Sequence, residues 1–406
     1  MRAVIRPGRA AGEVTVPGSK SVAHRLLIAA ALSGSVTDIL SCPDNEDVSA
    51  TADCLEALGA RVVRDSETAK VTVAGIPSEK TDKGLRVLPC HESGSTLRFL
   101  LPLALSDGVP TRMTGSPRLL ERPLSVYEDI CRQNGFLWER TADTLTVCGR
   151  LRAGEYVIPG GISSQFVTGL LFALPLLGGD SVVRLSSAPE SAPYIDLSLD
   201  VLSTCGVRID RPYERTFIIH GGQRFAAPPV VRVPGDESAA AFFGAMNALG
   251  GHVTLTGLDP ASRQGDRVYR ELFDACRAGC PTVSVRDCPD LAPILMVVGA
   301  CLYGVRLTGT SRLKYKESDR GAVMAQELRK CGVTVTVTSD TITVPGGQIA
   351  VPSVPLDGHG DHRAAMALGV LCTVTGGKID GAEAVSKSLP SFWEMIKSLG
   401  IDVTLV

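Results

Sequence analysis

The sequence predicts an α/β fold in which one repeated unit occurs six times and is shared between two pseudo-symmetric domains. Three observations predict this fold. At 406 residues the chain is too long for one compact core. Helix-like segments that end in glycine are followed by alternating apolar residues around a polar turn, as in CLEALGARVVRDSETAKVTVAG and ELRKCGVTVTVTSDTITVPGG. A short strand that runs into a Pro/Gly loop and a helix start recurs in step with these segments.

The helix ends of the repeat are marked by glycines that fit the C′ position, where a left-handed backbone conformation favours glycine. The alternation of apolar residues after each glycine fits the half-buried strands of a hairpin. The step between markers is about 70 residues except from Gly279 to Gly332, a spacing typical of domain repeats rather than of a solenoid. The markers are Gly59, Gly135, Gly206, Gly279, Gly332 and Gly400.

The helix starts of the repeat follow two series of loops. The first series is VPGSKS, VLPCHESGST, VIPGGISSQ, VPGDESAA, VRDCPDLAP and VPLDGHGDHR. The second is PDNEDV, PRLLERP, APESAPYID, RQGDRV, KESDR and SKSLPSF. Each unit therefore reads as strand, helix, strand, helix and hairpin, or βαβαββ. The alternative is an accidental resemblance among unrelated α/β segments, and it does not explain why two landmarks keep step.

The two domains are predicted from a pair of nearly identical loops, VPGSKS and VPGDES, each of which marks a crossing of the chain. One domain is then expected to span residues 19–231. The other combines residues 1–18 with residues 232–406. Three units fall in each domain, and a cleft between the domains is the expected place of the active site.

Composition excludes several classes of function. The net charge is −2, so no overall basic field draws the chain to nucleic acid or to an anionic membrane surface. The longest apolar stretches fall short of the roughly 20 residues of a membrane-spanning helix, and the N-terminus lacks the apolar core of a signal peptide. The twelve cysteines form no C-x-x-C pair, so we expect reduced thiols in a cytoplasmic protein and no metal site.

Unusual polar residues gather at the helix starts. The stretch VPGSKSVAHRLLIAAALSG predicts a helix from Ser21, and its first turns carry Lys20 and Arg25. Cations are unfavourable at the positive end of a helix unless an anion binds there. Ser21, Ser163 and Asp361 taken alone are ordinary N-caps. Recurrence of the same groups at equivalent places in the repeat favours a highly anionic ligand, and no P-loop, G-x-S-x-G or H-x-x-x-H pattern accompanies them.

The segments PGSKSVAHR, ESGSTLRF, GSPRLLERP, GGISSQF, SAPYID, KESDR, GDHR and SKSLPSF resemble the signature segments of the 5-enolpyruvylshikimate-3-phosphate (EPSP) synthase family, in the family's order along the whole chain. The resemblance implies transfer of the enolpyruvyl group of phosphoenolpyruvate to the 5-hydroxyl of shikimate 3-phosphate, with release of phosphate. It implies an inside-out α/β barrel in each domain, no cofactor and no metal. The chain is expected to be a monomer, because it supplies both halves of the site.

The resemblance also implies a role for each matching residue. Shikimate 3-phosphate would contact Lys20, Ser21, Arg25, Ser163, Ser164 and Ser191, with Gln165 between the two substrates and Tyr194 close by. Phosphoenolpyruvate would contact Lys20, Gly94, Arg118, Arg320, Arg363 and Lys387. Asp290 and Lys316 would hold the reacting hydroxyl, and Glu317 would carry the proton of the methylene carbon; Asp290, Glu317 and Lys20 are the expected catalytic residues.

Three positions depart from the residues of many family members: Glu92, Phe99 and Arg312. Two rival functions are disfavoured by particular residues. The sister family, UDP-N-acetylglucosamine enolpyruvyl transferase, typically has Lys-Asn in place of Lys20-Ser21 and a cysteine in the loop that reads GSPRLLERP here. A non-catalytic binder of anionic metabolites would not need Asp290 and Glu317, because carboxylates hinder anion binding unless they serve chemistry.

Overall fold

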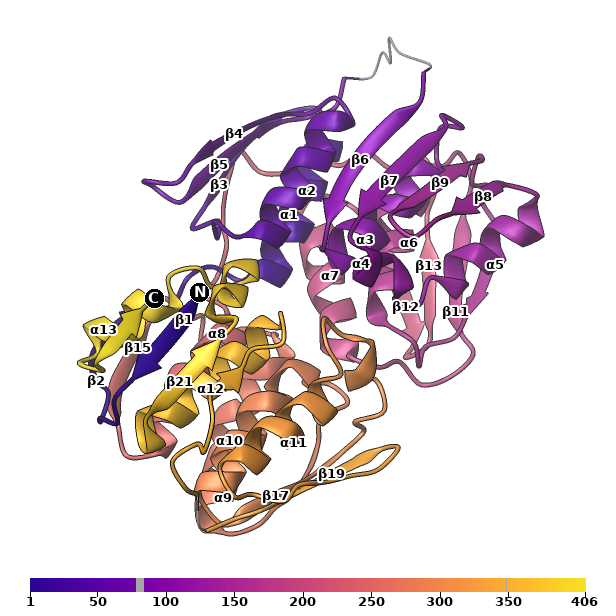
Figure 1. Cartoon of the computed structure of the whole chain (residues 1–406). Coiled ribbons are helices and arrows are strands. Elements are labelled where there is room, and N and C mark those ends of the chain that lie inside the picture. The colour runs from indigo at the N-terminus through magenta and orange to yellow at the C-terminus, as the bar shows by residue number, and fades with distance from the viewer. Residues whose placement is uncertain (78–83, 348) are drawn as a thin grey trace. The chain divides into compact units, whose positions relative to one another are not determined.

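The computed structural model describes residues 1–77, 84–347 and 349–406, and the chain divides into two compact units (Figure 1). The central unit is Gly18–Val233, and the terminal unit combines Met1–Pro17 with Pro234–Val406. The chain passes between them within the loops VPGSKS and VPGDES. The predicted boundaries, after residues 18 and 231, lie one and two residues from these points.

The central unit contains three four-stranded sheets of one design. In each sheet a parallel pair of strands is followed by two antiparallel neighbours. The sheets, in spatial order, are β14 (Val230–Arg232), β3 (Val36–Leu40), β5 (Lys70–Ala74) and β4 (Arg61–Asp65); β6 (Arg86–His91), β7 (Thr111–Gly115), β9 (Thr144–Cys148) and β8 (Leu137–Arg140); and β10 (Glu155–Ile158), β11 (Ser181–Leu185), β13 (Thr216–Ile219) and β12 (Ile209–Tyr213).

The helices of the central unit form its interior. Those that open each repeat, α1, α3 and α6, are buried nearly all round, whereas strands such as β5 and β9 alternate buried and half-buried residues, so the sheets form the outside. Helices α3 and α6 approach closely at Gly169, where a Cβ atom would lie 2.4 Å from the carbonyl oxygen of Arg98. The helices are α1 (Lys20–Leu32), α2 (Glu46–Ala57), α3 (Gly94–Ala104), α4 (Pro117–Glu121), α5 (Ser125–Asn134), α6 (Ser164–Ala173) and α7 (Ala192–Thr204).

The terminal unit repeats the design with two four-stranded sheets and one two-stranded sheet among the described residues. Its sheets are β16 (Thr282–Ser284), β17 (Gly304–Thr308), β19 (Thr341–Pro345) and β18 (Thr336–Val337); β20 (Leu356–Asp357), β21 (Gly377–Asp380), β1 (Arg2–Ile5) and β22 (Val403–Leu405); and β15 (His252–Thr256) with β2 (Ala11–Thr15). Its helices are α8 (Glu237–Ala248), α9 (Tyr269–Ala278), α10 (Ala292–Cys301), α11 (Arg320–Lys330), α12 (His362–Thr375) and α13 (Phe392–Ser398).

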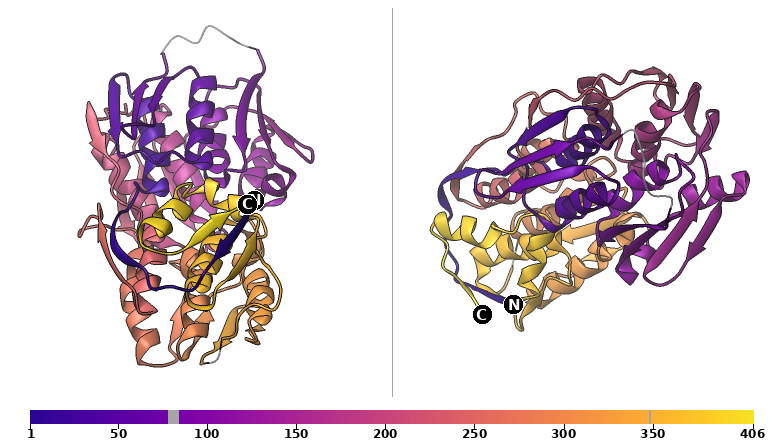
Figure 2. Two further views of the ribbon diagram at one scale, coloured as in Figure 1. Left: turned by 60° about the vertical axis from the view of Figure 1, so that its left-hand side comes forward. Right: turned by 90° about the horizontal axis from the view of Figure 1, so that it is seen from above.

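The sixth copy of the repeat is completed by the first strand of the chain. Strand β1 lies between β21 and β22, the position that β19 occupies between β17 and β18 in another sheet of this unit. The two chain ends therefore lie side by side, as Figure 2 shows, and the backbone N–H of Arg2 donates to the carbonyl oxygen of Val406 at 2.7 Å.

The prediction of a hairpin in every unit is wrong for the fourth copy of the repeat. After α9 the chain continues directly into β16 of another sheet, so β15 pairs with β2 alone among the described strands. The other five marker glycines have φ between +67° and +102°, whereas Gly279 has the extended value of +165°. The missing hairpin explains the short step from Gly279 to Gly332.

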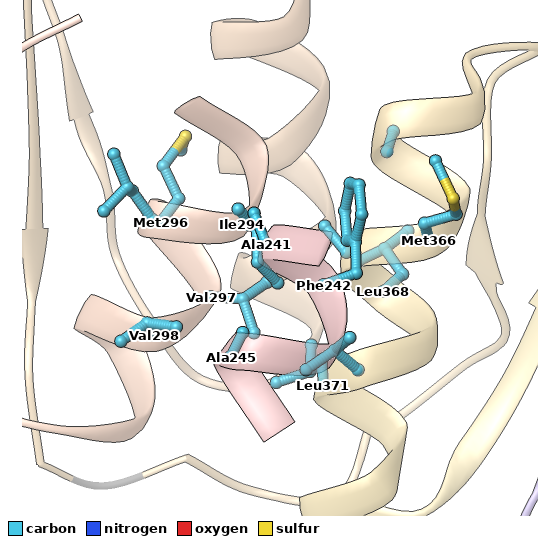
Figure 3. Packing of buried hydrophobic residues seen from close by; sticks show 14 of the residues in the cluster. Ala241, Phe242, Ala245, Ile294, Met296, Val297, Val298, Met366, Leu368 and Leu371 are labelled. Carbon is cyan, nitrogen blue, oxygen red and sulfur yellow. The ribbon is translucent and has the colours of Figure 1, made fainter. Parts of the chain in front are cut away.

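The core of the terminal unit is built on α8, α10 and α12. In Figure 3, Phe242 of α8 lies between Val297 of α10 and Leu368 of α12, and all three side chains are at most 1% exposed. This packing fixes the starts of the three helices relative to one another, and these starts carry polar residues.

Two further observations concern membrane-spanning helices and disulfide bonds. Within the described parts of the chain, no helix combines the length and the apolar character needed to cross a membrane. None of the twelve cysteines, all of which lie in described segments, forms a disulfide.

Candidate active site

Arg320, the first residue of α11, is the centre of a charged cluster in the terminal unit. Its side chain is 2% exposed. Its guanidinium donates from Nε to Asp361 (2.8 Å), from Nη1 to Asp290 (2.7 Å) and from Nη2 to Glu317 (2.8 Å). Burial lowers the pKa of Arg320, but attraction to Asp361, Glu317 and Asp290 outweighs it and leaves the pKa well above its usual value. The guanidinium therefore stays charged.

Asp361 is the structural anchor of this cluster. It is the N-cap of α12, where its Oδ1 accepts from the backbone N–H of Arg363 (2.9 Å). Its Oδ2 accepts from the Ser318 hydroxyl (2.9 Å) as well as from Arg320. The side chain is completely buried. Because these donors all belong to the protein itself, the part of Asp361 is to hold Arg320 in one orientation.

Asp290, on the one-turn helix Pro289–Leu291 before α10, gathers three cations. Arg320, Lys316 (3.2 Å) and Arg363 (3.4 Å) all donate to its carboxylate. Burial lowers the pKa of Lys316, and Asp290 opposes that shift. Burial also lowers the pKa of Arg363, but attraction to Asp290, Asp236 and Asp266 outweighs it. Asp290 and Glu317, the two carboxylates that are expected to be catalytic, therefore both contact the guanidinium of Arg320.

Lys387 and Arg363 extend the cluster along the start of α12. The Lys387 ammonium donates to the carbonyl oxygen of Gly360 at 2.8 Å. The Arg363 guanidinium lies over the Phe242 ring, 5.8 Å from its centroid, and its Nε is buried without a hydrogen-bond partner. Arg363 therefore carries an unused donor.

Asp266, in the loop RQGDRV, is a further buried carboxyl beside this cluster. It accepts from the hydroxyl of Ser238 on the first turn of α8. Burial and repulsion by Asp290 raise its pKa to about 7, and Arg363 opposes the shift. Asp266 therefore titrates near neutral pH.

Arg25 of α1 is the buried cation of the central unit. Its guanidinium donates to Ser198 Oγ (2.9 Å), to the carbonyl oxygen of Tyr194 (2.9 Å) and to that of Ser21 (2.5 Å). It also lies over the Phe99 ring, 5.0 Å from its centroid. Burial lowers the pKa of Arg25 to about 10, a value at which it stays charged at neutral pH.

The starts of α3 and α6 are joined through side chains. Gln165 accepts from Arg98 Nη1 (2.8 Å) and donates to Ser95 Oγ (2.9 Å). A Cβ atom on Gly94 would lie 2.8 Å from Nη1 of Arg122 and 2.9 Å from Nη1 of Arg98. Glycine is thus what allows two guanidinium groups to approach the backbone at this helix start.

The remaining predicted residues of the central unit also lie at helix starts. Ser163 caps α6, its hydroxyl accepting from the N–H of Gln165, and Ser164 is buried beside it. Ser191 precedes α7 with φ +56°, a left-handed value that serine rarely adopts. Lys20 forms an ion pair with Asp47 at 2.8 Å.

The predicted residues are thus divided between the two units. The terminal unit holds Asp290, Lys316, Glu317, Arg320, Arg363 and Lys387. The central unit holds Lys20, Ser21, Arg25, Gly94, Ser163, Ser164, Gln165, Ser191 and Tyr194. Arg118 belongs to the same unit but lies on the short helix α4, half-exposed and 3.7 Å from Glu121.

Sequence reasoning misses two partners of these groups. The N-cap role predicted for Asp361 is confirmed, but Asp361 also fixes Arg320, which its sequence pattern does not indicate. Asp47, the partner of Lys20, lies in the loop PDNEDV, and the recurrence of that loop in the repeat is the signal that could have found it. Ser21 is not the cap of α1, because Ser19 occupies that position.

Repeated α/β sheets around buried helices whose starts carry buried arginines define a protein of the enolpyruvyl-transferase fold. Two solved structures share it: EPSP synthase from Acinetobacter baumannii (TM-score 0.79, 24% identity, 100% of both chains) and the enolpyruvyl transferase NikO from Streptomyces tendae (TM-score 0.78, 18% identity, 99% of this chain and 98% of the other).

Closer relatives are found by sequence. Residues 4–396 match the family EPSP synthase (3-phosphoshikimate 1-carboxyvinyltransferase). The 3-phosphoshikimate 1-carboxyvinyltransferases of Clostridium kluyveri and Clostridium beijerinckii are 37% and 36% identical to this chain, over 98% of it and 97% of each relative. The chain belongs to the EPSP synthase family.

Proposed function

We propose that the chain is a 3-phosphoshikimate 1-carboxyvinyltransferase, a transferase of the shikimate pathway to chorismate and the aromatic amino acids. It transfers the enolpyruvyl group of phosphoenolpyruvate to the 5-hydroxyl of shikimate 3-phosphate and releases phosphate. The observation that carries the proposal is the contact of Asp290 and Glu317 with the single guanidinium of Arg320, in a chain that belongs to this family over residues 4–396.

The chemistry assigns different work to the two carboxylates. Addition to the enolpyruvyl double bond delivers a proton to the methylene carbon and removes one from the attacking hydroxyl. Elimination of phosphate then takes a proton back from that carbon. Glu317 carries the carbon proton in both directions, and Asp290, with Lys316, binds and deprotonates the 5-hydroxyl. Lys20 supplies positive charge to both substrates.

Arg320, Arg363 and Lys387, with Arg118 and Gly94 of the central unit, bind phosphoenolpyruvate. An anion that reaches Arg320 competes with Glu317 and Asp290 for its N–H groups, whereas Asp361 keeps Nε. Substrate binding therefore separates Glu317 or Asp290 from the Arg320 guanidinium. Loss of a nearby cation makes a carboxylate more basic, so the released carboxylate becomes better suited to accept a proton.

Shikimate 3-phosphate binds the group of the central unit. Ser163, Ser164 and Ser191 hold its phosphate, and Arg25 and Gln165 contact the ring; Ser21 and Tyr194 complete this set. Buried guanidinium, hydroxyl and helix N-terminal N–H groups together suit a phosphorylated polyol.

The test is phosphate release from phosphoenolpyruvate with two acceptors. Release with shikimate 3-phosphate and none with UDP-N-acetylglucosamine is the expected result. Release with the UDP-sugar alone would assign the sister activity, and binding of anions without release in either reaction would assign a non-catalytic binder. We further propose a monomeric, cytoplasmic enzyme, in keeping with its unpaired thiols.

A further inference from the structure

The segment that leads into α12 lies along helix α11 in a fixed register. The backbone N–H of Ala350 donates to the carbonyl oxygen of Cys331, and that of Ser353 to the carbonyl oxygen of Lys330, both at 3.0 Å. The Lys330 ammonium then reaches forward to the carbonyl oxygen of Pro355 (3.1 Å). These contacts run toward the start of α11, where Arg320 lies.

Glu327, in the last turn of α11, makes the main contacts that hold this segment against the helix. Its side chain is completely buried. Its carboxylate accepts from the Lys330 ammonium (2.7 Å), from the backbone N–H of Asp357 (2.8 Å) and from Nε2 of His359 (2.9 Å). A buried carboxylate with three donors holds its partners firmly, because losing any of them would leave charge uncompensated.

His359 is held in an uncommon conformation by these contacts. Its φ is +51°, in the left-handed region, and its backbone N–H donates to Asp357 Oδ1 at 2.7 Å. The side chain of His359 therefore points back to Glu327 while the chain turns toward α12.

The residues that follow immediately belong to the candidate active site. The carbonyl oxygen of Gly360 accepts from Lys387, Asp361 fixes Arg320, and Arg363 donates to Asp290. Their positions depend on where the turn at residues 357–359 is held. No part of Glu327 or His359 is assigned to either substrate.

We infer that Glu327 and His359 are positioning residues for the anionic substrate: they hold the turn from which Asp361 fixes Arg320, Gly360 holds Lys387 and Arg363 extends, and these three cations bind phosphoenolpyruvate. The inference rests on the proposed function only for the identity of that anion. Lys330 completes the contact from the same face of α11.

The test compares His359→Asn and Glu327→Gln with the wild type. Asparagine tolerates the left-handed conformation but is too short to reach Glu327. Asp210→Asn is the matched control, because it replaces the carboxylate of a histidine–carboxylate contact of similar length (2.8 Å, to His220) by a neutral amide, in a hairpin of the central unit. Michaelis constants for both substrates and hydrogen exchange of the peptide 355–363 are measured for each protein.

We expect the Michaelis constant for phosphoenolpyruvate to rise about tenfold in both variants, the equivalent of one lost charged hydrogen bond. Those for shikimate 3-phosphate stay within twofold, exchange of residues 355–363 becomes faster, and the control changes neither. Unchanged constants for phosphoenolpyruvate, or an equal rise for both substrates, would overturn the inference. If the Glu327→Gln variant does not fold, the Michaelis constants and hydrogen exchange of His359→Asn alone decide the test.

A wild-type protein that releases no phosphate would overturn the proposed function without deciding the role of the turn. In that case hydrogen exchange decides the role: faster exchange confined to residues 355–363 in the variants supports positioning by Glu327 and His359, and unchanged exchange refutes it.

Discussion

Replacing Arg320 by glutamine removes the cation on which three carboxylates converge. Glutamine is shorter and carries no charge, so Asp361, Asp290 and Glu317 lose a common partner that is 2% exposed. The substitution should reduce stability as well as binding of phosphoenolpyruvate, and stability can be measured without substrate.

The size of the loss follows from the partners that remain. Removing one member of a buried ion pair typically costs about 3–5 kcal/mol. Asp361 retains Ser318 and the N–H of Arg363, and Asp290 retains Lys316. We therefore expect the lower end, about 3 kcal/mol, at pH 7.

The dependence on pH distinguishes charge from packing. In the variant no cation separates the carboxylates, so they repel one another in the folded protein and protonation relieves this repulsion. The folded variant then binds more protons than the unfolded one, and its deficit should shrink as pH falls from 7 to 4.

Urea unfolding at pH 7 and pH 4 provides the assay. Arg132→Gln is the control, because Arg132 also pairs with two carboxylates, Glu128 and Asp129, but is 69% exposed. Such surface pairs contribute under about 1 kcal/mol. An Arg320→Gln deficit as small as that of the control, or one that does not change with pH, would refute the reasoning.

The same geometry supports four further predictions. Glu317→Gln and Asp290→Asn should each lose about 10²–10⁴-fold in turnover while shikimate 3-phosphate affinity holds or tightens; near-normal turnover in either variant would remove its catalytic role. Gly94→Ala should displace the flexible end of Arg122 at little cost in melting temperature but raise the Michaelis constant for phosphoenolpyruvate, which steady-state kinetics can check. Because Asp266 has a folded pKa of about 7 against an ordinary 3.8, unfolding free energy should fall between pH 4 and 7 by up to about 4 kcal/mol; Asp266→Asn should flatten this fall, as urea midpoints at pH 5 and 8 would show. Finally, shikimate 3-phosphate should compact the protein in small-angle scattering if both residue groups act on one pair of substrates, and an unchanged radius of gyration at saturation would contradict that expectation.

The fold can be predicted from the sequence because two kinds of landmark recur in step. Glycines in the left-handed conformation end helices wherever a hairpin follows, and such a local backbone preference can be predicted from the sequence. The missing hairpin after Gly279 is not predicted, although CPTVSVRDCPDLAP has room for only one strand before the next helix start. The place of β1 beside β21 could not be predicted, because pairing between residues 378 positions apart leaves no local signal.

The membership of the candidate site can be predicted from the sequence, but its contacts cannot. Cations at helix starts indicate an anion, yet the sequence does not say whether a ligand or the protein supplies it. Asp290, Arg320 and Asp361 come from three separate loops of the terminal unit, and only folding brings them within hydrogen-bond distance. The three-carboxylate environment of Arg320 is therefore a property of tertiary structure.

The discontinuous terminal unit has a consequence for the order in which the protein matures on the ribosome. The central unit is one continuous stretch and can fold as soon as Val233 has emerged. Strand β1 is made before the central unit, but its partners β21 and β22 are made after it. Residues 2–5 must therefore wait unpaired until residues 377–405 have been made, and the sheet that holds Asp357 closes only then.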